Sequence, residues 1–145
     1  MSKLGKRKAD SFPLFLKKGE TKMTIAEAIQ TVDAQRNNVC TMADKVAWLS
    51  EIDGKIKHEI IDTHADAESV PFDGYTVDTS MNTELIAEAP YDALYIPWLE
   101  SCIDRVLNET TRYNNSITRF NDKYDDYARY YNRTHMPLGK RIRFW

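Results

Sequence analysis

A seven-residue repeat of apolar and aromatic side chains runs through the second half of the chain. One position of the repeat holds Ile96, Ile103, Thr110, Ile117, Tyr124 and Tyr131, and the other holds Leu99, Val106, Tyr113, Phe120, Tyr127 and Thr134. Residues three and four apart share one face of a helix, so the repeat predicts helix over about residues 91–135. The residues leave two forms open: one helix about 65 Å long, or two helices separated in the polar stretch NETTRYNNS at 108–116.

A first helix is predicted to begin at Thr24, because Thr24 and Glu27 have the spacing of a capping box. The apolar residues that follow recur at helical spacing: Ile25, Ala28, Ile29 and Val32. This helix should run for about three turns and end near Asn37 and Asn38, since paired asparagines favour leaving a helix.

A second helix of roughly 20 residues is predicted after Thr41. Its apolar face holds Val46, Leu49, Ile52, Ile56 and Ile60. Its charged residues are expected away from that face: Lys45, Glu51, Asp53, Lys55, Lys57 and Glu59.

Helical periodicity fails between about His64 and Pro90, where only the short pieces GYTV and TELI favour extended structure. The predicted fold is therefore mainly α: a small helical bundle with one long C-terminal helix or a helix pair, and an irregular loop or small β-hairpin in the middle. A length of 145 residues suits one domain. We expect a flexible basic arm at 1–22, the helical domain at 23–137 with its insertion at about 64–90, and an extended tail at 138–145.

Charge is unevenly distributed along the chain. Residues 1–22 carry seven Lys and Arg against two acidic residues, and residues 58–104 carry eleven acidic residues and no Lys or Arg. From Arg105 onward, nine Lys and Arg oppose four acidic residues. Such a pattern favours contact with partners, or with copies of the chain itself, in a fixed orientation.

No catalytic set stands out in the sequence. The string HEIIDTH at 58–64 has the start of a zinc-protease motif, but Asp62 occupies the place of the second histidine. We therefore predict no enzyme activity, metal site or cofactor. No run of about 18 apolar residues is present, so we also predict no membrane partner.

The tyrosine-rich half of the repeat is a candidate subunit interface or core seam, formed by Tyr113, Ile117, Phe120, Tyr124, Tyr127 and Tyr131. Heptad stripes are usually core, but tyrosine is also enriched at interfaces where one end of the ring stays wet. A base-stacking platform is less favoured, because aspartates interleave with the rings. Arg105, Arg112 and Arg119 recur every seven residues and are expected to form one column facing the acidic surface of a neighbouring copy.

The last segment combines arginine with large apolar side chains: Arg141, Ile142, Arg143, Phe144 and Trp145. Arginine and tryptophan are the residues that dominate many protein interfaces. We expect this tail to dock into a partner or a neighbouring subunit.

Several ordered blocks of the sequence are similar to one known family. The blocks KVAWLSEIDGKI, TELI, APYDALYIPWL and RYNNSITRFNDKYDDYARYYNRTHMP resemble the small helical head-tail connector proteins, also called adaptor or head-completion proteins, of long-tailed bacteriophages. The resemblance covers about residues 23–138. The basic leader before Met23 is unlike the family.

The resemblance implies a structural virion protein that forms a closed ring of about twelve copies below the portal at the capsid vertex. Such a ring joins the portal to a tail-side stopper or tail-completion protein and continues the DNA channel without sequence-specific binding. It implies a place at the head–tail interface, reached from the host cytoplasm during assembly. It also implies that residues 138–145 dock on the portal.

An acidic loop would suit such a channel, because negative side chains repel passing DNA. The candidate channel-facing residues are Asp66, Glu68, Asp73, Asp78, Glu84 and Glu88. The alternative function is a small helical nucleic-acid-binding or host-directed regulatory module. In that case the basic leader and tail would contact nucleic acid, and binding would weaken with salt.

Overall fold

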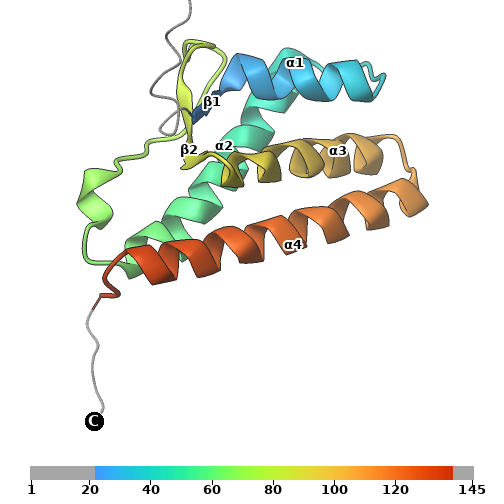
Figure 1. The fold of residues 1–145 in the computed structure, drawn as a ribbon. Helices are drawn as coiled ribbons and strands as arrows, with labels where there is room; N and C mark the ends of the chain where they lie inside the picture. The colour runs from blue at the N-terminus through green and yellow to red at the C-terminus, as the bar shows by residue number, and fades with distance from the viewer. Residues whose placement is uncertain (1–21, 139–145) are drawn as a thin grey trace, which may run out of the picture.

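The structure is a computed structural model that describes residues 22–138. Within this range the chain forms four α-helices and one two-stranded sheet (Figure 1). In chain order these are β1 (Lys22–Thr24), α1 (Ile25–Gln35), α2 (Met42–Glu59), β2 (Glu84–Glu88), α3 (Tyr95–Val106) and α4 (Thr110–Thr134). Three short 3-10 helices, Ile61–Thr63, Ala67–Ser69 and Tyr91–Leu94, lie between α2 and α3. The prediction of a mainly helical bundle is confirmed. The predicted arm up to Thr21 and the tail from Gly139 lie outside the described residues.

Both predicted helix starts are confirmed by their capping bonds. The Glu27 backbone N–H donates to Thr24 Oγ1 at 3.2 Å, and the Thr24 N–H donates to the Glu27 carboxylate at 2.9 Å. Thr41 caps α2 by accepting from the Asp44 N–H at 3.0 Å. Side-chain caps of this kind satisfy backbone donors that the first turn of a helix leaves free.

The apolar faces of α1 and α2 are buried as predicted, but two charged residues of α2 are buried with them. Lys45 and Asp53 lie in the interior rather than on the solvent side. Asp53 follows Leu49 by four residues and precedes Ile56 by three, so it shares their face. Lys45 lays its stem against the protein and places its ammonium 2.8 Å from Asp33.

The long repeat forms two helices. Helix α3 ends at Val106, and Asn108 takes a left-handed backbone conformation with φ of 58° that turns the chain. Asparagine adopts this conformation more readily than most residues. Helix α4 then folds back along α3 (Figure 1). The repeat therefore forms a helix pair with the break at 107–109. Val106, which was predicted to lie on the buried stripe, is exposed at the turn.

The segment between α2 and α3 contributes one strand to the sheet. Strand β2 contains three of the four residues of TELI and pairs antiparallel with β1, matching Lys22 with Glu88 and Thr24 with Glu84. The piece GYTV forms no strand. Its Gly74 has φ of 95°, and the Tyr75 N–H donates to Ser50 Oγ at 3.0 Å, so side-chain bonds fix this segment instead.

A short strap ties the end of α4 to the segment after α2. The Ala65 N–H donates to the Met136 carbonyl at 2.8 Å, and the Leu138 N–H donates to the Thr63 carbonyl at 2.8 Å. The strap therefore fixes the point from which residues 139–145 continue. Among the described helices, none has the length and apolar character needed to cross a membrane.

Candidate functional site

The predicted seam is divided between the interior and the surface of α4. Phe120, Tyr127 and Tyr131 are buried in the hydrophobic core, whereas Tyr113, Ile117 and Tyr124 are partly exposed. The Phe120 ring packs against Trp98 of α3, with ring centroids 5.1 Å apart. Much of the seam is thus used inside the subunit, to hold α4 against α3.

The tyrosine hydroxyls have different partners along the helix. Tyr124 donates to Glu59 at 2.7 Å, which links α4 to the end of α2. The Tyr127 hydroxyl is buried and makes no hydrogen bond with the described residues. The Tyr131 ring stacks on His135 with centroids 3.7 Å apart, and burial raises the pKa of Tyr131 to about 12. Burial raises the pKa of all three hydroxyls, so they stay protonated at neutral pH. Among them, Tyr124 is the one that donates a hydrogen bond within the described residues.

The three arginines do not form one column, because the turn at 107–109 places Arg105 on a different helix from Arg112 and Arg119. The Arg119 guanidinium donates to Glu100 of α3 at 2.9 Å and is committed within the subunit. Arg105 and Arg112 are exposed and make no ion pair with the described residues. These two remain available to a neighbour.

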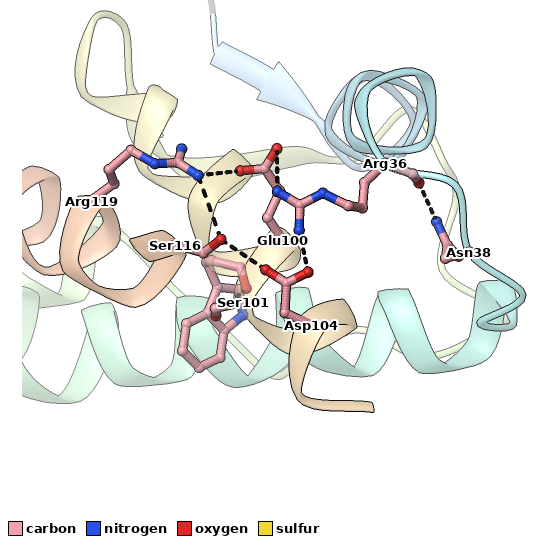
Figure 2. A network of polar contacts seen from close by, with 8 residues as sticks. Arg36, Asn38, Glu100, Ser101, Asp104, Ser116 and Arg119 are labelled. Atoms are coloured by element: carbon pink, nitrogen blue, oxygen red, sulfur yellow. Dashed lines mark hydrogen bonds and ion pairs between the residues drawn. The ribbon is translucent and has the colours of Figure 1, made fainter. Parts of the chain in front are cut away.

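Arg119 belongs to a buried polar network that joins α1, α3 and α4 (Figure 2). Arg36, at the end of α1, pairs with fully buried Asp104 of α3, and Ser116 of α4 donates to the other oxygen of that carboxylate at 3.0 Å. Arg36 also lies 3.7 Å from Glu100. The bonded Asp104 carboxylate raises the pKa of Arg36 above its ordinary value. The network satisfies its buried charges internally, as buried ions require.

Most of the candidate acidic loop residues lie at the surface. Asp66, Glu68, Asp73, Asp78 and Glu84 are exposed, and Glu88 is partly buried. Glu88 accepts from the Tyr130 hydroxyl at 2.9 Å, and Asp66 lies 3.6 Å from His135. Asp73 and Glu84 line a groove of about 440 Å³ beside the sheet.

Sequence reasoning missed Asp53, a fully buried acid of α2 that binds residues of the segment between α2 and α3. Its carboxylate accepts hydrogen bonds from the hydroxyls of Tyr75 and Tyr95, each at 2.5 Å, and from the Ile86 N–H at 3.1 Å. Burial raises the pKa of Asp53 to about 6, and the three bonds offset part of that effect. The sequence signal for the burial of Asp53 was its position on the same helix face as Leu49 and Ile56, because that face is buried.

The network around Asp104 was missed as well. Glu100 and Asp104 are one turn apart within the apolar stripe of α3, which is the available sign that they are buried. Nothing local in the sequence indicates that Arg36, in a different helix, supplies their counter-charge.

The HEIIDTH string does not assemble as a metal site. His58 is exposed, His64 is buried with its Nδ1 2.6 Å from the Ile60 carbonyl, and Asp62 pairs with Lys57 at 2.9 Å. Within residues 22–138, no group of three or more His, Cys, Asp or Glu side chains is placed to hold a metal ion.

The arrangement as a whole suits binding by surfaces. Its buried polar groups bond mainly to one another, while exposed Arg105 and Arg112 and several exposed loop acids make no ion pair within the described residues. Comparisons with profiles of known protein families, with curated proteins and with solved structures found no match to the chain.

Proposed function

We propose that the chain is a structural subunit of a bacteriophage virion. Copies assemble as a closed ring of about twelve subunits that joins the portal at the capsid vertex to a tail-side stopper or tail-completion protein. The ring continues the DNA channel without reading the DNA sequence. This role involves no catalysis, cofactor or membrane, and the subunit passes from the host cytoplasm to the head–tail interface.

The placement of exposed apolar side chains carries this proposal. Within residues 22–138, seven large apolar side chains are exposed, and six of them belong to the two ends of the helical bundle. Val39, Met42, Val106 and Leu107 belong to the α1–α2 and α3–α4 turns at one end (Figure 1), Met136 and Leu138 follow α4 at the other, and Val77 is the seventh. We take the two ends, where these apolar side chains are exposed, as the interaction surfaces of the subunit.

The two ends are far apart and unlike each other. The pairing of Arg36 with Asp104 holds the end of α1 beside the end of α3, which brings the first four apolar residues to the same end. The 25 residues of α4 span about 37 Å between this end and the strap. Two unlike surfaces on one subunit favour head-to-tail contact, which closes into a ring when the rotation between copies allows it.

Charge adds support for contact between unlike parts of neighbouring subunits. Residues 22–138 carry eleven Lys and Arg against twenty Asp and Glu, whereas residues 1–21 and 139–145 together carry nine against two. Complementary charge gives orientation and speed to association more than affinity. The exposed loop acids, such as Asp66 and Glu68, are suited to a channel wall that does not retain DNA.

Native mass spectrometry tests the proposal directly. The purified chain and a variant ending at Leu138, which keeps the apolar end and the strap, are each measured alone and after mixing with the portal ring of the same phage. We expect a complex of ring size on the portal with the full chain and its loss with the shortened variant, because the variant lacks residues 139–145 of the tail that is proposed to dock there. A chain that stays monomeric with the portal, and instead binds DNA in a salt-sensitive manner, would contradict the proposal and favour the nucleic-acid-binding module.

A further inference from the structure

The groove beside the sheet has walls of mixed character. Val70, Pro71 and Phe72 give it apolar surface, Asp73 and Glu84 give it negative charge, and Lys22 of β1 also lines it. Its volume of about 440 Å³ lies in the range of sites that hold small ligands or the anchor side chains of a peptide.

The groove walls are held in place by contacts with the body of the protein. Tyr75 is fixed by its bonds to Ser50 and Asp53, and its ring meets Phe72 edge to face at 5.1 Å. On the other side, the Ile25 N–H at the start of α1 donates to the Thr83 carbonyl at 3.0 Å. The groove is thus a preformed feature, which lowers the cost of binding.

The leader before β1 has a composition that complements the groove. Residues 11–18 read SFPLFLKK, with four large apolar side chains followed by two lysines. The proposed assembly uses the positive charge of the leader but assigns no role to these apolar side chains. The chain enters the described fold at Lys22, on the border of the groove, so the leader is tethered next to it.

We propose that residues 11–18 fold back onto their own subunit and occupy this groove. The apolar side chains of this segment pack on the apolar wall formed by Val70, Pro71 and Phe72. Lys17 and Lys18 face the carboxylates of Asp73 and Glu84.

The tether is long enough for this return. The six residue steps from Lys22 back to Leu16 reach about 20 Å when extended, and Gly19 adopts turn conformations at low cost. A short connection also gives an effective concentration in the millimolar range. The subunit's own leader therefore outcompetes the same segment from a free second copy.

Hydrogen exchange of the full-length chain tests the inference. Exchange is measured for backbone amides of residues 69–75 and 83–86 in the wild type and in a Phe12→Ser, Phe15→Ser double variant. If the leader binds with an affinity near 0.1 mM, its release should speed exchange there roughly tenfold. A Leu4→Ser variant, altered in the leader outside residues 11–18, should match the wild type. Equal exchange in the wild type and the double variant would overturn the inference.

Charge reversal in the groove supplies an independent readout. Asp73→Lys with Glu84→Lys should release the leader and raise exchange at residues 69–72, whereas Asp78→Lys, an exposed loop acid outside the groove lining, should not. Equal release by Asp78→Lys would show that the effect comes from the overall charge, and it would overturn the inference that the leader binds in the groove. Protection that falls on dilution would assign the contact to a second copy and overturn folding back within one subunit.

Discussion

At the scale of single residues, Asp53 joins separate segments of the chain. Its carboxylate binds Tyr75 of the loop, the Ile86 N–H of β2 and Tyr95 at the start of α3. Tyr95 in turn accepts from the Ala87 N–H at 2.8 Å. One buried acid thereby positions both the loop that lines the groove and the strand that supports it.

Asp53→Ala should lower the free energy of unfolding by about 3 kcal/mol or more, because two hydroxyls and one N–H lose their buried acceptor. Glu51→Ala, an exposed acid in the same helix, should change it by less than about 0.5 kcal/mol. Urea denaturation at neutral pH measures both. Equal effects of the two substitutions would show that the Asp53 bonds do not stabilise the fold.

The pKa of Asp53 also predicts a dependence of stability on pH. Burial raises this pKa from 3.8 to about 6, so between these values the folded chain keeps a proton that the unfolded chain has lost. The protonated Asp53 carboxyl therefore adds to the free energy of unfolding. This contribution is fully present below about pH 4 and is lost as the pH rises through about 6, by about 3 kcal/mol in all. The difference in unfolding free energy between wild type and Asp53→Ala should shrink over this window. A constant difference would contradict the raised pKa.

At the scale of elements, short sequence patterns predicted the features that depend on nearby residues. The starts of α1 and α2 followed from Thr24 and Thr41, because a cap is formed within four residues of sequence. The mainly helical fold followed from the apolar periodicity. The break between α3 and α4 did not follow, since Asn108 permits a left-handed turn without requiring one.

Features that depend on contacts between distant residues could not be predicted from the sequence. Strand β1 has three residues, and its partner β2 lies about sixty residues further on. The candidate seam was identified by its spacing, but its division into core and surface depends on how α3 covers α4. The polar network of Arg36, Asp104 and Ser116 likewise joins three helices whose packing no local pattern encodes.

The turn between α3 and α4 gives a prediction at this scale. Asn108→Val should destabilise the fold by about 1–2 kcal/mol, because a β-branched residue is strained at φ of 58°. Asn108→Gly should keep stability within about 1 kcal/mol, since glycine adopts this conformation freely. Thermal unfolding of both variants measures the contrast. Equal stability of the two variants would show that the turn does not need a left-handed residue.

The polar network between the helices gives a second prediction at this scale. Ser116→Ala removes the hydrogen bond to Asp104 and should cost about 1.5–3 kcal/mol, the range for a bond to a charged group. Thr118→Ala, two residues away on the exposed side of α4, is the matched control and should cost less than about 0.5 kcal/mol. Chemical denaturation distinguishes them, and a Ser116→Ala variant as stable as the control would contradict the role of the network.

At the scale of the whole molecule, the subunit is an elongated bundle with two unlike apolar ends. One end carries Val39, Met42, Val106 and Leu107, together with Arg105 and Arg112, which make no ion pair within residues 22–138. The other carries Met136 and Leu138 on the strap, close to Asp66. In the proposed ring, head-to-tail contact pairs these two surfaces and leaves the sides of the ring for the portal and the tail.

Mixing two variants tests this pairing most directly. Val106→Asp disables one end and Met136→Asp the other, while Val77→Asp changes an exposed apolar residue in the loop between α2 and β2. Native mass spectrometry is carried out at concentrations where the wild type assembles. Each end variant alone should be monomeric, their mixture should form a pair of one copy of each and stop there, and Val77→Asp should assemble like the wild type. Assembly of either end variant by itself, or no pair in the mixture, would contradict head-to-tail contact through these ends.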